Sequence, residues 1–430
     1  MIAALLRAWA LGVVRVFYPW RAVSGRSHAP ARGPVLVVAN HPNGLVDPLL
    51  VRLALGQPVA FLGKSTFWQN PFFRACMEAF DGLPVYRAHE ADTRQNDATF
   101  AACRDRLARG GWLALFPEGK SHDATTLQPL KTGAARIALA AAAAGAPVVV
   151  LPVGLCYADK ETFRSAVAVA VGRPVPVPAG ATPDDRAAVQ ALTAAISAAL
   201  GEVVLQAEDA TLWRAFLAVA AWTGATALDA REARARALSR AWSALLAADP
   251  EAAEALAEEV RAYARALDAV GVQDPFSIEA ATPGPAAGSL LALVALAPLA
   301  LLGAALGWLP YRAIRPLSRR LAAGHADVVG TIKLLAGSLL LPLWWAAQAA
   351  AAAALAGPAE ALLVLLLGPL CGALALHWDE RRVRRLDALR GIALRLFRPD
   401  TALALAQRRR ELTAAVLQRL DAPRGDHAPA

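Results

Sequence analysis

Residues 35–48 read VLVVANHPNGLVDP, a strand-like run that ends in a polar turn. The five apolar residues predict a short buried strand, which the turn beginning at Asn40 interrupts with proline and glycine. His41 therefore stands at the exit of a strand, and Asp47 follows six residues later. A carboxylate that accepts a hydrogen bond from one imidazole nitrogen fixes the tautomer and leaves the other nitrogen free as a base. The pair is two-thirds of a hydrolytic triad, and a substrate alcohol can supply the missing hydroxyl.

The same two residues have a plainer interpretation. A histidine and an aspartate at this spacing more often cap a turn and begin a helix, because short motifs arise frequently by chance. The rest of the chain decides between the two.

An alternation of strand and helix surrounds this stretch. From about residue 34 to residue 204, short apolar runs separate segments of helical periodicity. This order predicts an α/β domain with a mixed, largely parallel sheet, in which loops at the strand ends carry the chemistry. The predicted strands are Val35–Ala39, Val59–Leu62, Trp112–Phe116, Val148–Leu155 and Ala166–Val171, and the predicted helices are Asp97–Arg109, Thr132–Ala144 and Pro183–Leu205.

Two further loops hold candidate binding residues. Arg87 follows a short apolar run, and its guanidinium can offer two N–H donors to a phosphate, although an isolated arginine there is usually a surface residue. Residues 117–121, PEGKS, bring a carboxylate, a glycine, a cation and a hydroxyl to one strand end. We expect Glu118 to hold a substrate hydroxyl, and Ser121, Lys131 and nearby backbone amides to receive a phosphate.

Several common catalytic patterns do not fit. Residues 63–65 and 119–121 both read GKS, but a P-loop needs a glycine where Pro58 and Ala114 stand. No serine lies in a G-x-S-x-G nucleophile elbow, which disfavours an ordinary α/β-hydrolase. The cysteines show neither metal-binding nor redox spacing, which favours small core residues in a reducing compartment. They are Cys76, Cys103, Cys156 and Cys371.

Four short blocks follow one another along the chain: His41 with Asp47, Gly82 to Arg87, Phe116 to Gly119 with Ser121, and Leu151 to Val153. In this order they resemble the blocks of the glycerolipid acyltransferase family, which includes glycerol-3-phosphate and lysophosphatidate acyltransferases. Four ordered blocks are far more specific than any one of them. The resemblance spans roughly Arg32 to Gly172.

The resemblance implies roles for individual residues. His41 and Asp47 form the catalytic pair, and Pro152, in a strand that otherwise reads as bent core, shapes the acyl site. The residues that bind the phosphorylated acceptor are Arg87, Glu118, Gly119, Ser121 and Lys131. No metal or resident cofactor is implied, and acyl-CoA or acyl carrier protein (acyl-ACP) serves as the co-substrate.

The catalytic block departs from the common family spacing. Five residues separate His41 from Asp47, where four are usual, so we expect the turn at Asn43-Gly44 to absorb the extra residue. NHPNGLVDP-like blocks resemble a subset that includes fungal-type glycerol-3-phosphate or dihydroxyacetone-phosphate acyltransferases.

The composition points to a membrane. The 430 residues are 57% hydrophobic, and the formal net charge of +9 favours an anionic partner. Because the chain is so apolar and has no zinc-finger or RNA-recognition signature, we expect phospholipid rather than nucleic acid.

The sequence predicts five segments. They are an N-terminal interfacial membrane helix (1–25), an acyltransferase domain (26–206), a helical accessory region (207–280), membrane-embedded hydrophobic helices (281–378) and a basic cytosolic tail (379–430).

Charge sets the expected orientation of the hydrophobic segments. The arginine clusters at Arg312–Arg320 and Arg381–Arg385 predict cytoplasmic flanks, which suits a bacterial inner membrane. We expect Pro298 to fold the first segment into a re-entrant hairpin, so that the catalytic domain stays in the cytoplasm. The segments are Ala286–Leu309, Leu334–Ala356 and the shorter Ala361–Leu376.

The sequence thus predicts a membrane O-acyltransferase of phospholipid biosynthesis that acylates glycerol-3-phosphate. One alternative is acylation of lysophosphatidate or another lysophospholipid by the same residues. Another is an inactive lipid-binding membrane scaffold, although such a protein has no physical need to keep this polar set. A third, a small transporter domain in the C-terminal segments, would carry intramembrane acids or bases, of which only Glu360 and His377 are marginal candidates.

Overall fold

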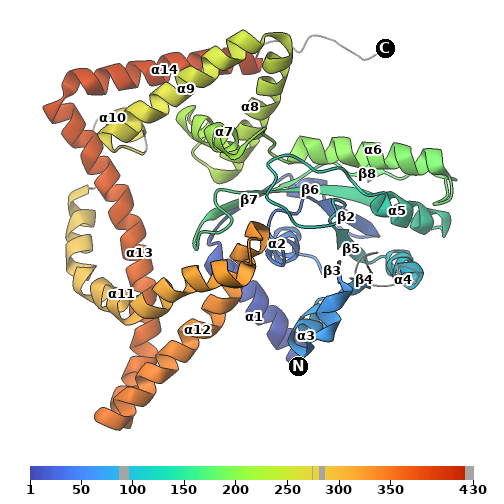
Figure 1. The fold of residues 1–430 in the computed structure, drawn as a ribbon, viewed down its shortest axis with the longest axis horizontal. Coiled ribbons are helices and arrows are strands. Elements are labelled where there is room, and N and C mark those ends of the chain that lie inside the picture. Colours follow the sequence, from blue (N-terminus) through green and yellow to red (C-terminus); the bar gives the residue numbers. More distant parts are fainter. Residues whose placement is uncertain (87–95, 274, 280–285, 422–430) are drawn as a thin grey trace. The chain divides into compact units, whose positions relative to one another are not determined.

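The computed structural model of the chain describes residues 1–86, 96–273, 275–279 and 286–421 (Figure 1). The chain divides into two compact units. The first unit contains residues 1–217, 226–236 and 322–334, and the second unit contains residues 218–225, 237–321 and 335–430.

A mixed sheet of eight strands forms the centre of the first unit. Its strands are β1 (Trp20–Ser24), β2 (Val35–Ala39), β3 (Val59–Lys64), β4 (Leu83–Val85), β5 (Trp112–Leu115), β6 (Val149–Tyr157), β7 (Ala166–Val171) and β8 (Val175–Pro176). Their order is β1-β7-β6-β2-β5-β3-β4, with β8 also against β6. The pairs are parallel except those of β6 with β7 and β8. The predicted mixed, largely parallel sheet is confirmed.

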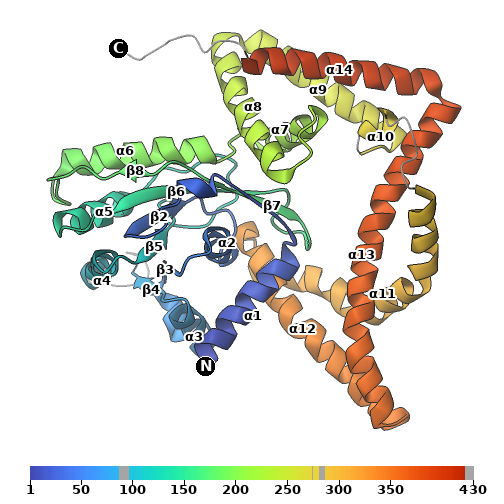
Figure 2. The same ribbon diagram turned by 180° about the vertical axis from the view of Figure 1, so that it is seen from behind.

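Helices cover both faces of this sheet. Those of the first unit are α1 (Ile2–Phe17), α2 (Val46–Leu55), α3 (Pro71–Ala79), α4 (Asn96–Ala108), α5 (Gly133–Ala143) and α6 (Arg186–Val203), together with the first residues of α7 (Ala210–Trp222), of α8 (Leu228–Ala248) and of α12 (Ala326–Leu355). Figures 1 and 2 show α5 and α6 on one side of the sheet and α2 on the other.

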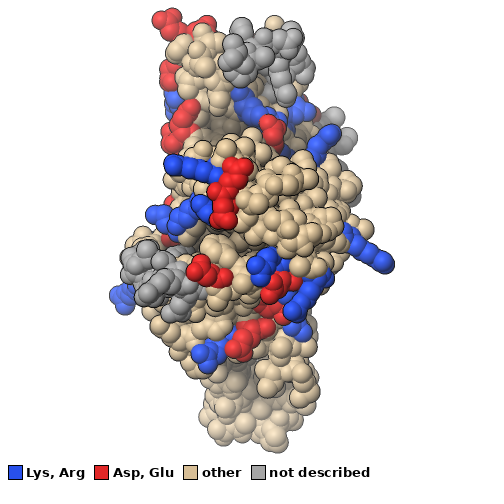
Figure 3. All heavy atoms as spheres, turned by 90° about the vertical axis from the view of Figure 1, so that its right-hand side faces the viewer, with Lys and Arg blue, Asp and Glu red and all other residues tan. Residues whose placement is uncertain are grey.

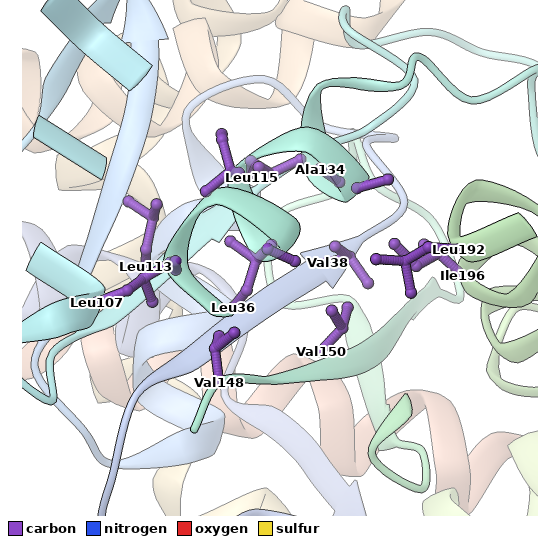
Figure 4. Close-up of a cluster of buried hydrophobic side chains, with 14 of the residues drawn as sticks. Leu36, Val38, Leu107, Leu113, Leu115, Ala134, Val148, Val150, Leu192 and Ile196 are labelled. Carbon is purple, nitrogen blue, oxygen red and sulfur yellow. The ribbon is translucent and has the colours of Figure 1, made fainter. Parts of the chain in front are cut away.

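The core lies between the strands and helices α4 to α6. Leu36 and Val38 of β2 alternate with residues that point to the opposite face, as the period of a strand requires. They pack with Leu113 and Leu115 of β5 and with side chains from the helices (Figure 4). All five residues of β2 are at most 1% exposed, which explains its unbroken run of apolar residues.

Residues 20–24 form edge strand β1, paired with β7, although the sequence predicts an interfacial membrane helix over residues 1–25. The helix itself is present as α1, where Ile2 and Leu5 are more than half exposed.

The second unit is helical. Its helices are the rest of α7 and of α8 (Leu228–Ala248), then α9 (Pro250–Val270), α10 (Phe276–Glu279), α11 (Ala286–Ala322), most of α12 (Ala326–Leu355), α13 (Pro358–Phe397) and α14 (Pro399–Asp421). Asp249 and Pro250 separate α8 from α9, because the Asp249 side chain caps α9 and Pro250 occupies its first turn.

Helices α11, α12 and α13 are each long and apolar enough to cross a membrane. Large apolar side chains such as Leu301, Leu343 and Leu366 are at least half exposed along them, which indicates membrane association. The lowest part of the surface in Figure 3, at the height of the ends of α12 and α13, shows no charged side chain on this face. The predicted hairpin at Pro298 is wrong, because α11 continues through this residue as one helix.

Candidate active site

The candidate site lies where three neighbouring strands end. Strands β5 and β6 flank β2 and run parallel to it, with Val38 opposite Leu115 and Ala39 opposite Val153. Parallel strands bring their carboxyl ends to one edge, so the residues after β2, β5 and β6 meet there.

His41 and Asp47 form the predicted pair. The Nδ1 atom of His41 lies 2.9 Å from Oδ2 of Asp47, although five residues separate them. The intervening turn closes through hydrogen bonds from the backbone N–H groups of Val46 and Asp47 to the carbonyl of Asn43. Gly44 adopts a φ of +34°, which suits glycine. The expectation that Asn43-Gly44 absorbs the extra residue is confirmed.

Three donors surround the carboxylate of Asp47. Its Oδ2 also accepts the backbone N–H of Asn43 at 2.7 Å, and its Oδ1 accepts the hydroxyl of Tyr157 at 2.5 Å. Burial raises the pKa of Tyr157 well above its ordinary value, and the charge of Asp47 adds to this, so the phenol remains a donor. The carboxylate is fully buried yet satisfied, which holds it in one orientation toward the imidazole.

The imidazole of His41 is held by more than Asp47. Its ring stacks on Phe116, with centroids 3.9 Å apart and planes 11° from parallel. Among the described residues, Nε2 has no hydrogen-bond partner, and the side chain is 16% exposed. A histidine held at Nδ1 and open at Nε2 has the geometry of a general base.

Glu118 faces the protein rather than open solvent. Its Oε1 accepts the backbone N–H of His41 at 3.0 Å, and its Oε2 accepts the backbone N–H of Gln128 at 3.0 Å and a hydrogen bond from His122. The carboxylate is fully buried. Glu118 therefore joins the loop after β5 to the loop that carries His41.

Two side chains hold the His41 loop against β6. The Asn40 amide donates to the carbonyl of Leu155 at 3.0 Å and accepts its N–H at 2.8 Å, which continues the pairing where β2 turns away. Lys160 donates to the carbonyl of Pro42 at 2.7 Å and pairs with Asp123.

Beneath the turn lies a buried Tyr18–Asn43 pair. The Asn43 amide donates to the Tyr18 hydroxyl at 2.8 Å, and this hydroxyl donates to the carbonyl of Lys160 at 2.5 Å. Burial raises the pKa of Tyr18 above its ordinary value, so the phenol stays neutral. The turn between His41 and Asp47 is thus held by Tyr18 as well as by the backbone hydrogen bonds inside the turn.

The start of α12 forms one wall of this site. Residues 322–334 belong to the first unit. Ser121 donates a hydrogen bond to the carboxylate of Asp327, and Lys333 donates to the carbonyl of Glu161 at 2.8 Å. A Cβ on Gly330 would lie 2.6 Å from the carbonyl oxygen of Lys160 and 2.9 Å from the Oδ1 atom of Asn43. Only a glycine lets α12 approach the turn this closely.

The remaining predicted residues are distributed differently. Lys131 donates its backbone N–H to Pro117 at 2.8 Å, and its side chain lies against Gly119, whose φ is +81°. Pro152 is buried in β6 opposite Val38, within the sheet. Arg87 lies outside the described residues.

A cavity of about 480 Å³ opens beside the His41 loop. Its lining includes Glu118, His122, Tyr157, Lys160 and Trp213, and so combines polar groups with aromatic rings. The described lining residues include Pro42 but not His41. The cavity therefore adjoins the candidate base without containing it.

Sequence reasoning missed several members of this site. Tyr157 ends a strand beside β2, so its place at the shared edge could have been inferred from strand order. Lys160 and His122 follow strand ends in the same way, but nothing in the sequence links Asp327 to Ser121 across 206 positions. Within the described part of the chain, no group of three His, Cys, Asp or Glu side chains is placed to hold a metal ion.

Parts of this chain are similar to known proteins. Residues 21–155 match the family model described as Acyltransferase. Glycerol-3-phosphate O-acyltransferase 2 of Saccharomyces cerevisiae is 40% identical over 89 residues, which are 20% of this chain and 12% of that protein. A 1-acyl-sn-glycerol-3-phosphate acyltransferase of Chlamydomonas reinhardtii is 28% identical over 155 residues, 36% of this chain and 45% of that protein.

The similar solved structures include the 1-acyl-sn-glycerophosphate acyltransferase PlsC of Thermotoga maritima. It is 17% identical, with a TM-score of 0.33, and the match covers 45% of this chain and 77% of that one. The chain spans less than half the length of the curated relatives described above. The resemblance expected from the four sequence blocks is confirmed by the family model. Residues 21–155 of this chain form a domain of the acyltransferase family.

Proposed function

We propose that this chain is a membrane-bound O-acyltransferase that moves a fatty acyl group from a thioester to a hydroxyl of glycerol-3-phosphate. The observation that carries the proposal is the arrangement of His41, with Nδ1 bound to a buried carboxylate and Nε2 open. This arrangement suits removal of a proton from an alcohol.

The reaction needs no acyl-enzyme. Nε2 of His41 takes the proton of the acceptor hydroxyl as its oxygen attacks the thioester carbonyl. The tetrahedral intermediate then collapses, the carbon–sulfur bond breaks, and the leaving thiolate takes the proton from the imidazolium. The carboxylate of Asp47 stabilises that imidazolium, and the stacked ring of Phe116 limits its rotation.

The acceptor phosphate is proposed to bind near the loop after β5. Lys131 is exposed there, and its Nζ has no partner among the described residues. Arg87 keeps the role that the family resemblance implies. Glu118 is proposed as a positioning residue, because both its oxygens are already bound to the protein.

The choice of acceptor follows the relatives. Glycerol-3-phosphate O-acyltransferases match at 40% and 38% identity over short stretches, whereas 1-acyl-sn-glycerol-3-phosphate acyltransferases match at 28% and 34%. Acylation of lysophosphatidate is therefore the second candidate. Acyl-CoA and acyl-ACP are the proposed donors, and no resident cofactor is proposed.

The test is acyl transfer by membranes that contain the wild type, His41→Ala or His325→Ala. Each receives glycerol-3-phosphate or lysophosphatidate with a labelled acyl-CoA or acyl-ACP. We expect transfer to glycerol-3-phosphate, lost at least 100-fold in His41→Ala and unchanged in His325→Ala, whose histidine is exposed. Equal activity of the wild type and His41→Ala would remove His41 as the base, and transfer only to lysophosphatidate would select the second acceptor.

The proposed location is the bacterial inner membrane, with the first unit in the cytoplasm and α12 and α13 crossing as a hairpin. Because residues before and after α11 belong to the first unit, α11 is proposed to be embedded without crossing. Arginine clusters near α11 and α13 support this orientation. In a chain without its native cysteines, a membrane-impermeant maleimide should label Ala356→Cys in intact spheroplasts and label His325→Cys only after lysis. The reverse pattern would invert the orientation.

A further inference from the structure

A second cavity lies within the second unit, between α11 and α13. Its volume of about 550 Å³ falls in the range of roughly 300–1,000 Å³ that small-molecule pockets occupy. The indole N–H of Trp378 donates to the carbonyl of Leu293 at 2.8 Å, which ties the two helices together. Farther along, a Cβ on Gly303 would lie 2.0 Å from the carbonyl oxygen of Cys371, so the helices touch through their backbones. The cavity is therefore held between two fixed helices.

One side of this cavity is basic. His377, Arg381, Arg384 and Arg385 line it. Spacings of three and four residues place these side chains on one face of α13. No carboxylate occurs among the described lining residues. The pocket therefore carries three positive charges with no acid facing them.

The donors in this pocket are largely unused. Among the described residues, Arg381 and Arg385 have neither an ion-pair nor a hydrogen-bond partner. Arg384 donates only to a backbone carbonyl, that of Glu380, at 3.3 Å. Several planar guanidinium groups in one pocket match the geometry of a phosphate, whose oxygens accept paired N–H donors.

The neighbouring arginine on the same helix behaves differently. Arg382 does not line the cavity but pairs with Asp379 at 2.6 Å, and its guanidinium lies over the ring of Trp378. It offers a matched control with the same charge and the same helix.

The other side of the cavity is apolar. Leu293 and Leu296 of α11 and Leu374 of α13 line it. Residues 361–376 of α13 are apolar throughout and span about 24 Å at 1.5 Å per residue. The arginines begin at Arg381, after His377, Trp378, Asp379 and Glu380, at the level where such a helix leaves the hydrocarbon core. A ligand here meets cations at the headgroup level and leucines below it.

We propose that this pocket binds one anionic phospholipid, with its phosphate on Arg381, Arg384 and Arg385 and an acyl chain along Leu293, Leu296 and Leu374. The charge selects an anionic headgroup, and the apolar side selects a lipid over free phosphate. The proposal concerns the helical unit alone and does not depend on the proposed acyl transfer.

The test is native mass spectrometry of the purified full chain in detergent micelles that contain equal amounts of dioleoyl phosphatidylglycerol and dioleoyl phosphatidylcholine. We expect the wild type to retain the anionic lipid about tenfold better than the zwitterionic one, and Arg381→Gln/Arg385→Gln to lose that preference. Arg382→Gln should keep it. Arg381→Lys/Arg385→Lys preserves the charge that orients the helices and should retain a reduced preference.

Two further arms separate a lipid from a free anion. Leu296→Trp fills the apolar side and should lower retention of phosphatidylglycerol about tenfold while the arginines remain. Millimolar inorganic phosphate should not displace the lipid from the wild type. Unchanged preference in Arg381→Gln/Arg385→Gln, equal loss in Arg382→Gln, or displacement by phosphate alone would each overturn the proposal. Lipid retention is measured without acyl donor or acyl acceptor, so an inactive site near His41 does not affect the result.

Discussion

The hydroxyl of Ser121 donates its hydrogen bond to the carboxylate of Asp327, which lies 206 residues later in the first turn of α12. The sequence assigns Ser121 to phosphate binding, whereas this contact gives it a structural partner. We expect Ser121→Ala and Asp327→Ala each to slow acyl transfer, and the double variant to be little worse than either. Hydrogen bonds to a charged group contribute about 1.5–3 kcal/mol, so the coupling should be measurable in a double-mutant cycle.

A phosphate-binding role for Ser121 predicts a different pattern. In that case Ser121→Ala raises KM for the acceptor by the same factor whether or not Asp327 is present. Additive losses in the cycle would therefore favour the role given by the family resemblance.

Replacing Glu118 by glutamine should be severe despite the similar shape. The carboxylate accepts N–H donors on both oxygens, from His41 on one and from Gln128 and His122 on the other. An amide places its own N–H₂ against one set of donors whichever way it turns. We expect kcat to fall roughly 10- to 100-fold, since an unsatisfied buried group costs about 1–3 kcal/mol. Steady-state kinetics should leave KM for the acceptor nearly unchanged, with exposed Asp184→Asn as the control. A raised KM with normal kcat would mean that Glu118 binds substrate directly.

Tyr157→Phe tests the support of the buried carboxylate. The substitution removes the donor to Oδ1 of Asp47 and leaves the pair of Asp47 with His41 in place. We expect kcat to fall about tenfold, because the loss of one charged hydrogen bond weakens the hold on the base. Tyr86→Phe is a matched control, since its side-chain hydroxyl makes no hydrogen bond to another described residue and Tyr86 follows a different strand, β4. An unchanged kcat would show that the other two donors to Asp47 suffice.

Gly330→Ala should disturb the turn from outside. The added methyl carbon would meet the backbone carbonyl oxygen of Lys160 at 2.6 Å, so the helix has to move away. Gly337→Ala, on the same helix, meets its nearest atom at 3.8 Å and gains helix propensity. We expect the first variant to lose activity and about 1–3 kcal/mol of stability, and the second to lose neither. Thermal unfolding and acyl transfer measured on both variants check this, and equal behaviour would remove α12 from the site.

Cys103 predicts how stability depends on pH. Burial raises the pKa of its thiol from 9.0 to about 12. The thiol therefore ionises at lower pH in the unfolded chain than in the folded one. Its contribution to the free energy of unfolding is complete below pH 9 and is lost as the pH rises toward 12. At 1.36 kcal/mol for each pKa unit the total is at most roughly 4 kcal/mol. Cys103→Ala should flatten the fall in melting temperature between pH 8 and pH 10.5, whereas Cys371→Ala should not. Parallel slopes in the wild type and Cys103→Ala would contradict the assignment.

The sequence predicted the centre of the site better than its surroundings. The apolar run before His41 fixes a buried strand, and the turn chemistry of Asn43-Gly44 allows the pair with Asp47, so local patterns were sufficient there. Strand β1 escaped prediction because its five residues follow a helical pattern without a clear break and pair with a strand far along the chain.

Long-range contacts account for most other differences. The sequence suggested Glu118 as a substrate ligand because nothing in the motif at residues 117–121 identifies a partner within the protein. The backbone N–H groups that donate to its carboxylate come from two separate loops. Pro298 looked like a hinge, yet a proline can remain within a long helix when its neighbours tolerate the lost hydrogen bond. Neither outcome can be read from local periodicity.

The wall that α12 contributes has a consequence for biosynthesis. His41, Asp47 and Glu118 are translated early, but Asp327, Gly330 and Lys333 leave the ribosome only after the whole of α11. A nascent chain that stops at residue 217 therefore holds every residue of the sequence motifs and still lacks one side of the site. The site can reach its final form only after α11 has been synthesised. Maturation of the active site therefore follows synthesis of the first long apolar helix.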